Sequence, residues 1–474
     1  MHLEFPDPSL VLLVGPTSSG KSTFARAHFA PTQVVSSDAC RAMVADDEND
    51  QSATAAAFSL LHHIVAHRLE RARLTVVDAT SVRAAARAPL VELARRWHLP
   101  TVALVFDLPL ELCEARRAAR EDRDAGPDVL LRQREQLHRE IESLEVEGHA
   151  VVHVLRTPGQ VAALRLVGVP LPPDRRRERG PFDVIGDVHG CADELEALLT
   201  RLGYAPGAGG AWRHAEGRRA VFVGDLVDRG PRIADALRLV MDMADAGSAL
   251  VVPGNHDDKL LRKLQGRTVQ VAHGLELTLA ELAAAPPEFA PRVRAFLEGL
   301  PSHLVLDGGA LVVAHAGLPL ALHGRESRHV RDRALFGETT GVPGADGLPM
   351  RIDWAAEYRG RALVAYGHTP VLAPRWRHET VDLDTSCVFG GALTALRWPE
   401  RELVAEPARR QYAVPGRAIA ADPFVSREVA RSERARSGGA RSDTASPGTA
   451  RSGGARLPSG GVGRPSSRDP NSPD

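Results

Sequence analysis

The second half of the chain contains five short apolar runs, and each one ends in residues that can bind a metal ion. Runs of this length predict buried β-strands, so the residues that follow them are expected at strand ends. Carboxylate, imidazole and amide groups on five strand ends can converge on one cleft, where they suit divalent cations. A single Gly-Asp pair would be an ordinary turn, but five such ends in succession predict a metal centre. The runs and their ligands are 182–185 with Asp187 and His189, 220–223 with Asp225, 249–252 with Asn255, 311–314 with His315, and 363–367 with His368.

Two metal ions a few Å apart need a shared carboxylate, and Asp225 is the natural bridge. The loops GDVHG, GDLVDRG and GNHD, followed by the two later histidines, resemble the calcineurin-like binuclear metallophosphoesterases, and within them the phosphoprotein-phosphatase type. The resemblance implies that Arg229 clamps the phosphate and that His256, paired with Asp228, protonates the leaving oxygen. It also implies that one metal is held by Asp187, His189 and Asp225, and the other by Asp225, Asn255, His315 and His368.

The first half of the chain opens with a phosphate-binding pattern of another kind. The apolar run 10–14 predicts a buried strand, and the segment GPTSSGKST follows it with the G-x-x-x-x-G-K-S spacing of a phosphate-binding loop. Backbone N–H groups of such a loop cradle phosphate oxygens, while its lysine reaches the transferred phosphate and its serine binds Mg²⁺. We therefore predict that ATP and Mg²⁺ bind at Gly15, Ser18, Ser19, Gly20, Lys21, Ser22 and Thr23.

Acidic residues follow the next two predicted strands. The strand 33–36 leads to Asp38 and, three residues on, to Arg41. A hydroxyl acceptor needs a carboxylate to take its proton and a cation to hold its phosphate, and this pair offers both on one helical face. A surface ion pair is the competing interpretation. Asp78, after the strand 74–77, either orients Mg²⁺-bound water or caps a helix.

A cluster of arginines follows the strand predicted at 101–106. Arg116, Arg120 and Arg123 recur at nearly helical spacing. Such a run is either a solvated helix face or a lid over the ATP phosphates. We favour the lid, because phosphoryl transfer concentrates negative charge that arginine stabilises.

Together these features of the first half resemble the 5′-hydroxyl polynucleotide kinases. Followed by a metallophosphoesterase in this order, they are similar to the kinase and phosphatase modules of the bacterial polynucleotide kinase-phosphatases over about residues 5 to 410. The resemblance implies that Asp38 acts as general base and that Arg41 holds the acceptor's phosphate. It further implies that one half phosphorylates 5′-OH ends of RNA or DNA, while the other removes 2′,3′-cyclic, 2′- or 3′-phosphates with two divalent metals, Mn²⁺ being the expected ion.

Two other functions stay open at this point. The metal loops also occur in Ser/Thr protein phosphatases and in dinucleoside polyphosphate hydrolases, so the chain would then be such an enzyme fused to a small-molecule kinase. A scaffold with inactive sites is the third interpretation, and the complete ligand set speaks against it. The spacing of motifs does not separate RNA from DNA, because that distinction depends on contacts to the 2′-hydroxyl.

We expect an α/β protein in which a P-loop NTPase-type parallel sheet precedes an α/β metallophosphoesterase β-sandwich flanked by helices. The predicted ranges are 1–168 for the kinase, 169–180 for a Pro- and Arg-rich linker, and 181–414 for the phosphoesterase. Residues 415–474 are rich in Ser, Gly, Arg and Pro and predict a disordered tail without a ligase domain. The resemblance therefore implies a separate ligase, and an RNA methyltransferase, as partners.

Two segments between the metal ligands, 281–300 and 325–359, are expected to build the rim of the site. Within the second of these, Trp354 and Tyr358 either stack a terminal base or belong to the core. Asp384, after the last metal ligand, is expected to support a metal-bound histidine from behind.

The composition sets limits on partners and location. The net charge of −1 means that nucleic-acid contacts must come from local patches. No apolar run approaches the length of a membrane span, and the first ten residues lack the features of a signal peptide. The four cysteines stand far apart in sequence and suggest no disulfide, so a cytoplasmic protein is expected. The oligomeric state, a homodimer included, is left open.

Overall fold

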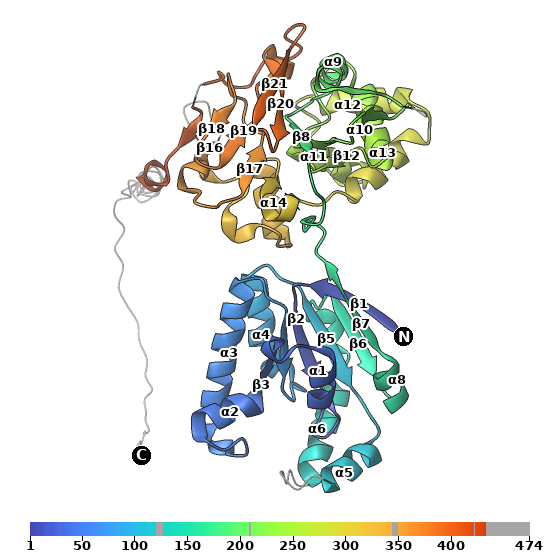
Figure 1. The fold of residues 1–474 in the computed structure, drawn as a ribbon, viewed down its shortest axis with the longest axis vertical. Coiled ribbons are helices and arrows are strands. Elements are labelled where there is room, and N and C mark those ends of the chain that lie inside the picture. Colours follow the sequence, from blue (N-terminus) through green and yellow to red (C-terminus); the bar gives the residue numbers. More distant parts are fainter. Residues whose placement is uncertain (120–126, 208–209, 344–348, 421, 433–474) are drawn as a thin grey trace, which may run out of the picture.

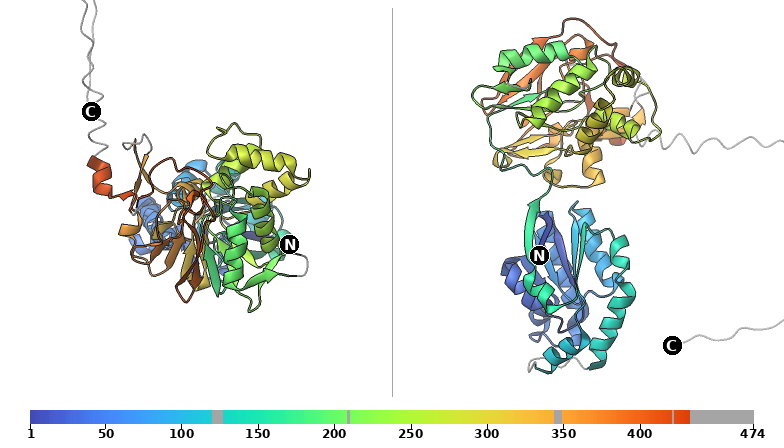
Figure 2. Two further views of the ribbon diagram at one scale, coloured as in Figure 1. Left: turned by 90° about the horizontal axis from the view of Figure 1, so that it is seen from above. Right: turned by 90° about the vertical axis from the view of Figure 1, so that its right-hand side faces the viewer.

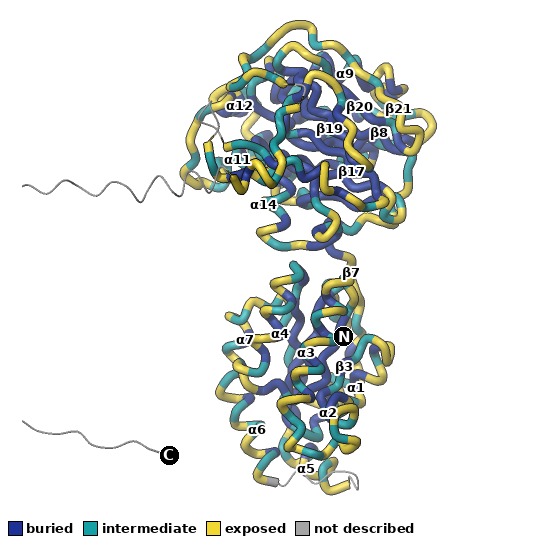
Figure 3. The backbone as a smooth tube through the Cα atoms, turned by 90° about the vertical axis from the view of Figure 1, so that its left-hand side faces the viewer, coloured by how far each residue is buried: buried dark blue, intermediate teal, exposed yellow. Residues whose placement is uncertain are grey.

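The computed structural model describes residues 1–119, 127–207, 210–343, 349–420 and 422–432. Its elements form an N-terminal unit that contains strands β1 to β7 and a C-terminal unit that contains strands β8 to β22 (Figure 1). Strand β7 leads from one unit into the other, as the right-hand view of Figure 2 shows. The tube in Figure 3 shows buried backbone running through the middle of both units.

The N-terminal unit is organised around β2, a strand whose five residues are all buried. It lies in the centre of a parallel sheet with the order β3-β4-β2-β5-β6. Leu10, Leu12 and Val14 pack on one face of the sheet, while Val11 and Leu13 pack on the other. Burial on both faces explains the continuous apolar run, because helices cover both sides of a parallel sheet. The strands are β2 Leu10–Val14, β3 Val34–Ser36, β4 Thr75–Asp78, β5 Thr101–Phe106 and β6 Val151–Leu155; the helices are α1 Lys21–His28, α2 Ser37–Ala45, α3 Thr54–Glu70, α4 Ala84–Arg96, α5 Leu110–Ala118, α6 Pro127–Glu140, α7 Ser143–Val146 and α8 Pro158–Ala163.

The C-terminal unit contains two five-stranded sheets that pack face to face. Phe182 and Val184 from the first sheet share a buried cluster with Leu311, Val313 and Leu363 from the second. The fold class expected from the sequence is confirmed: a parallel sheet with helices precedes an α/β sandwich. The first sheet is β12 Ala249–Val251, β11 Arg219–Phe222, β8 Phe182–Ile185, β20 Ala392–Trp398 and β21 Glu402–Pro407; the second is β13 Leu304–Leu306, β14 Leu311–Val313, β17 Leu363–Tyr366, β19 Thr380–Asp382 and β18 Arg375–Trp376.

Helices cover the outer face of the first sheet, where they form the largest hydrophobic cluster of the unit. Pro286 and Pro287 fall between two of them, so the segment 281–300 contributes to two helices, in keeping with the inability of proline to continue a helix. Helix α11 begins directly at the ligand Asn255. These helices are α9 Ala192–Leu202, α10 Ile233–Asp245, α11 Asn255–Leu264, α12 Leu275–Ala284, α13 Phe289–Glu298 and, at the other sheet, α14 Arg328–Phe336.

Three small sheets complete the fold. In the first, β1 pairs in parallel with β7, and β7 ends at Pro170 inside the predicted linker. The linker then continues along β13, where Arg175 donates its N–H to the Val305 carbonyl at 3.0 Å. The last strand, β22, pairs with β16, so the described fold extends beyond residue 414, where the sequence predicts the tail to begin. The strands are β1 His2–Asp7, β7 Arg165–Pro170, β9 Tyr204–Pro206, β10 Trp212–His214, β15 Thr339–Pro343, β16 Pro349–Ile352 and β22 Phe424–Val425.

The two units touch through Arg325, which is 5% exposed. Its guanidinium donates to the carbonyls of Leu69 at 3.1 Å, Glu70 at 2.5 Å and Trp97 at 2.5 Å, and it lies over the Trp97 ring. These carbonyls lie at the C-terminal ends of α3 and α4, where a cation is favourable. Arg325 therefore ties two helices of the N-terminal unit to the C-terminal unit.

Trp354 and Tyr358 belong to the core. They are 5% and 4% exposed and pack in a cluster with Tyr366 on the outer face of the second sheet. The Tyr358 hydroxyl donates to the Ala362 carbonyl at 2.9 Å. The hypothesis that they stack a terminal base is therefore wrong, because burial leaves their ring faces no open side. Within the described residues, every helix is too short or too polar to span a bilayer.

Candidate active sites

The predicted metal ligands converge where the two sheets meet. Strands β8, β11 and β12 are parallel neighbours, so the loops after them lie at one edge of the first sheet. Strands β14 and β17 are likewise parallel neighbours in the second sheet. As a result, ligand atoms of Asp187, Asp225 and His315 lie within 4.8 Å of one another, and so do those of His189, Asp225 and His256. Asp225 belongs to both groups, as a bridging ligand would.

Asn255 and the two later histidines meet at a second point. The Asn255 side-chain oxygen lies 3.0 Å from Nε2 of His315 and 2.7 Å from Nδ1 of His368. These two ring nitrogens are 3.1 Å apart. His315 Nε2 is in turn 3.5 Å from the Asp225 carboxylate. All six predicted metal ligands are thus brought together.

Backbone carbonyls set the orientation of the ligand rings. Nδ1 of His189 donates to the Val227 carbonyl at 2.8 Å, and Nδ1 of His315 donates to the Val223 carbonyl at 3.1 Å. Each bond leaves Nε2 as the lone-pair-bearing nitrogen, which is the form that binds metals.

Several residues of the site have backbone conformations that non-glycine residues rarely adopt. His189, Asp225, Asp228, Arg229 and His368 all have positive φ angles, between 45° and 73°. Conformations of this kind cost of order 1–3 kcal/mol each and persist where surrounding structure imposes them, often at functional sites. Glycines provide the matching space: a Cβ on Gly367 would lie 1.9 Å from the Asp187 carboxylate, and one on Gly254 would lie 2.0 Å from that of Asp225.

The electrostatics of these residues favour bound cations. Burial, together with the nearby Asp384 and Asp225, raises the pKa of Asp187 well above its usual range. Burial also lowers the pKa values of His315 and His368, so their rings are neutral. Carboxylates crowded together beside neutral imidazoles repel one another, which destabilises the folded site. Bound divalent cations offset this repulsion. The donor set therefore fits two such ions.

The predicted proton donor and the predicted phosphate clamp adjoin the predicted metal ligands. Nδ1 of His256 lies 2.6 Å from Oδ2 of the fully buried Asp228, whose other oxygen accepts from the Thr278 hydroxyl at 2.5 Å. The Arg229 guanidinium bridges Nε2 of His189 at 2.7 Å and Nε2 of His256 at 2.8 Å. Arg229 and His256 thus face the same space, as the predicted roles of clamp and general acid require.

That space is a cavity of about 400 Å³. Its walls contain Asp225, Asn255 and His368 together with Arg229 and His256. Part of the predicted rim segment 325–359 also lines it, through Phe336, Thr339, Pro349 and Arg351. Sequence reasoning missed Lys259, His273, Arg351, Phe389 and Arg417, which line the cavity and stand in no recognisable motif.

Asp384 lies behind the metal ligands, although no described contact joins it to a histidine. It is 5% exposed, and one of its oxygens accepts the Ser386 N–H at 3.2 Å. Burial raises its pKa to about 6. The charge of Asp384 contributes to raising the pKa of Asp187.

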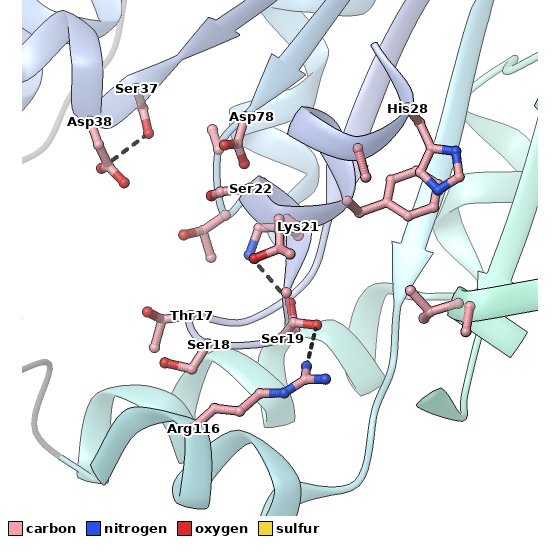
Figure 4. A pocket seen from close by; sticks show the side chains of 18 residues that line it. Thr17, Ser18, Ser19, Lys21, Ser22, His28, Ser37, Asp38, Asp78 and Arg116 are labelled. Atoms are coloured by element: carbon pink, nitrogen blue, oxygen red, sulfur yellow. Dashed lines mark hydrogen bonds between the residues drawn. The ribbon is translucent and has the colours of Figure 1, made fainter. Parts of the chain in front are cut away.

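The phosphate-binding loop of the N-terminal unit lines a second cavity, of about 530 Å³. Figure 4 shows Asp38 on the α2 side and Arg116 on the α5 side of this loop. The Lys21 ammonium donates to the carbonyls of Gly15 at 2.8 Å and Pro16 at 2.7 Å. The Gly15 carbonyl accepts from the Lys21 ammonium. The predicted nucleotide-binding residues that line the cavity are Ser18, Ser19, Gly20, Lys21, Ser22, Thr23 and Arg116.

Arg116 is the one predicted lid arginine in the described chain, and its guanidinium donates to the Ser19 carbonyl at 3.1 Å. It therefore lies against the phosphate-binding loop, where a lid would be. Arg120 and Arg123 lie outside the described residues.

The two acidic residues predicted near the acceptor both line this cavity. Asp38 follows Ser36, whose hydroxyl caps helix α2. Asp78 is the last residue of β4 and does not cap the following helix, because the N-cap of α4 is Arg83. Arg41 is buried and donates to Asp38 at 2.9 Å and to the Glu48 carbonyl at 2.7 Å. Arg41 is thus placed to hold Asp38, and its role toward the acceptor's phosphate stays a prediction.

Both halves of the chain match known protein families. Residues 10–144 match the family described as AAA domain, and residues 180–397 match the family described as calcineurin-like phosphoesterase. The bis(5′-nucleosyl)-tetraphosphatase PrpE [asymmetrical] of Anoxybacillus flavithermus is 45% identical over 240 residues, which are 49% of this chain and 96% of the relative. The chain belongs to the calcineurin-like phosphoesterases.

Further relatives carry the same printed name. The PrpE proteins of Geobacillus thermodenitrificans and Bacillus subtilis are 48% and 45% identical, over 48% and 49% of this chain and 94% and 96% of their own lengths. Calcineurin-like phosphoesterases use divalent metals, and the AAA domain indicates nucleotide binding. This phosphoesterase is therefore an enzyme with a kinase-like unit attached to it.

Two cysteines of the phosphoesterase lie together although they are distant in sequence. Ligand atoms of Cys191, Cys387 and Glu194 lie within 4.8 Å of one another, and all three residues are buried. The pair of strands β8 and β20, which are neighbours in one sheet, brings the loops that carry these two cysteines together. All four cysteines of the chain are free thiols.

Proposed function

We propose that this phosphoesterase is a bifunctional nucleic-acid end-healing enzyme. The observation that carries the proposal is the presence, in one chain, of a phosphate-binding loop facing an acidic residue and of a phosphoesterase cavity. A kinase and a phosphatase that act on the same terminus would reverse each other's reaction. They cooperate at a strand break, where the 5′-OH end needs a phosphate and the 3′ end must lose one.

In the N-terminal unit, the proposed reaction is transfer of the γ-phosphoryl group of ATP to a 5′-OH. Asp38 would take the hydroxyl proton as the new O–P bond forms and the β,γ-bridging bond breaks to release ADP. Lys21 would leave the loop carbonyls for the phosphates, and Arg116 would offset their charge. Ser22 and Asp78, which line the same cavity, would hold Mg²⁺ and its water.

In the C-terminal unit, the proposed reaction is hydrolysis of a 2′,3′-cyclic, 2′- or 3′-phosphate. Two divalent ions held by Asp187, His189, Asp225 and their partners would supply Lewis acidity and an activated water. Arg229 would hold the phosphate oxygens through two donor groups. His256, oriented by Asp228, would deliver a proton to the leaving ribose oxygen.

A second candidate is hydrolysis of dinucleoside tetraphosphates, as the name of the PrpE relatives states for them. The identity of 45% over 96% of such a relative favours it. In that case the N-terminal unit would phosphorylate a small molecule. Both candidates use the same cations and the same Arg229, so they differ only in what the cavity accepts beyond the reacting phosphate.

A single set of assays separates the candidates. The full chain is incubated with ATP and a 5′-OH oligonucleotide, and separately with RNA ending in a 2′,3′-cyclic phosphate and with diadenosine tetraphosphate. End healing predicts label transfer that is lost in Asp38→Asn, and RNA dephosphorylation that is lost in Asp187→Asn. Cleavage of the tetraphosphate alone, without transfer to the oligonucleotide, would establish the second candidate instead. Parallel DNA oligonucleotides determine the nucleic-acid preference, and added ligase reports whether the healed ends can be sealed by a separate protein.

A further inference from the structure

The C-terminal residues 415–420 and 422–425, which we call the C-terminal segment, contribute one wall of the phosphoesterase cavity. Pro415, Gly416, Arg417, Ala418, Ile419 and Pro423 all line it. The segment lies beyond residues 180–397, which are the ones that match the phosphoesterase family. The cavity of this chain therefore has a wall that the family pattern does not include.

Several contacts hold this segment in place. Strand β22 pairs with β16 through Arg351 and Phe424. Asp422 accepts from Arg375 at 3.1 Å and from Arg377 at 2.9 Å. Farther on, Arg427 donates to Glu357 at 2.7 Å. A segment that is anchored both by strand pairing and by ion pairs can present a side chain at a fixed position.

The wall adds Arg417 to the cationic side chains that line the cavity. Arg229, Lys259, Arg351 and Arg417 line the cavity, against Asp225 as the single carboxylate among the described residues that line it. Arg351 donates to the His368 carbonyl at 2.9 Å, which fixes it next to the predicted metal ligands. Like charges gathered in a partly buried cavity repel, and a bound anion offsets this repulsion.

One phosphate does not account for all four cations. Arg229 already faces the reacting phosphate, together with the predicted ions. We propose that Arg351 and Arg417 form a second phosphate subsite, which binds the phosphate next to the one that is removed. This inference rests on the proposed phosphoesterase activity and narrows its substrates to those with at least two phosphates. The neighbouring group is either a phosphodiester of a nucleic-acid strand or a further phosphate of a polyphosphate chain.

The subsite is tested by binding, so that the result does not depend on turnover. All proteins carry Lys21→Ala, which removes the phosphate-binding loop of the other unit as a competing site. Calorimetry with Mn²⁺ present measures the affinities for inorganic pyrophosphate and for inorganic phosphate. Three proteins are compared: the Lys21→Ala protein itself, called the parent, and the parent with Arg417→Ala or with Arg410→Ala added. Arg410 is the matched control, because it lies in the same C-terminal region over the Tyr412 ring and does not line the cavity.

Loss of one charge-assisted hydrogen bond predicts that Arg417→Ala weakens pyrophosphate binding about ten-fold more than phosphate binding. Arg410→Ala is expected to keep the ratio of the parent. Equal effects on both anions, or no effect on either, would overturn the subsite. Turnover then identifies the source of the second phosphate. If that phosphate is a phosphodiester, Arg417→Ala lowers kcat/KM for a 3′-phosphorylated RNA dinucleotide. If it belongs to a polyphosphate chain, Arg417→Ala lowers kcat/KM for diadenosine tetraphosphate. A pyrophosphate effect without any hydrolysis would keep the subsite and refute the proposed function.

Discussion

Replacing Asp228 by Asn tests the proton donor of the phosphoesterase. Asp228 is fully buried and accepts two hydrogen bonds, from His256 at 2.6 Å and from Thr278 at 2.5 Å. An Asn keeps the shape but has one acceptor oxygen, so one of these donors meets an amide N–H instead. It also removes the negative charge that stabilises the protonated imidazole.

The expected loss depends on the leaving group. Removing a general acid costs about 10²–10⁴-fold in rate where the leaving oxygen needs a proton. A ribose 3′-phosphate has such a leaving group, whereas nitrophenolate leaves readily without protonation. We therefore predict that Asp228→Asn lowers kcat for a 3′-phosphorylated oligonucleotide by about 10²–10⁴-fold and lowers kcat for 4-nitrophenyl phosphate far less.

The assay compares kcat for both substrates in the wild type, in Asp228→Asn and in Thr278→Val. Thr278→Val removes a hydrogen bond to the same carboxylate without changing its charge, and it controls for a general disturbance of the pocket. An equal loss on both substrates in Asp228→Asn would refute the reasoning. It would mean that Asp228 positions the loop and does not act through the proton on His256.

Three further predictions concern stability and metal binding. Arg325→Ala removes charge-assisted hydrogen bonds of about 1.5–3 kcal/mol each between the units, so calorimetry should resolve two separate unfolding transitions; a single unchanged transition would contradict this. Glu147→Gln removes the carboxylate closest to the buried Arg87, leaving Glu140 at 3.7 Å as its other acidic neighbour, and should lower the stability of the N-terminal unit by about 1.5–3 kcal/mol. Burial opposes ionisation of Glu147, but Arg87 lowers its pKa from 4.5. The difference in stability between Glu147→Gln and the wild type should therefore persist above pH 4.5 and vanish as the pH falls through the folded-state pKa. A stability difference that grows in acid would refute this assignment. Gly367→Ala places a Cβ 1.9 Å from the Asp187 carboxylate and should abolish binding of one cation in a metal titration, whereas retained binding would show that the loop can shift.

Residues that depend on local pattern could be predicted from the sequence. Each metal ligand lies in the loop or turn after a strand whose apolar run is visible or, for Asn255, at the start of the helix that follows, and β8 and β2 begin and end where the sequence predicts. The phosphate-binding loop is equally local, because its chemistry requires fixed spacing between glycine, lysine and serine. Convergence of the ligands then follows from the parallel pairing of β11 with both β8 and β12, and of β14 with β17.

Residues that act through long-range packing gave no such signal. Arg325 resembles any surface arginine until α3 and α4 are placed beside it. Trp354 and Tyr358 have the composition of a stacking platform, and only the second sheet shows that they are buried. The segment after residue 414 is poor in apolar residues, so its anchoring by Asp422 and by pairing with β16 could not be read from composition.

The most direct test of this account is the number of cations in the C-terminal site. Purified protein is loaded with Mn²⁺, desalted and analysed by mass spectrometry for metal per chain, with Asp225→Asn alongside. A site built from two ligand groups that share Asp225 predicts two ions in the wild type and fewer than two in the variant. A wild-type chain that retains one ion or none, or a variant that retains two, would contradict the binuclear centre on which the proposed phosphatase rests.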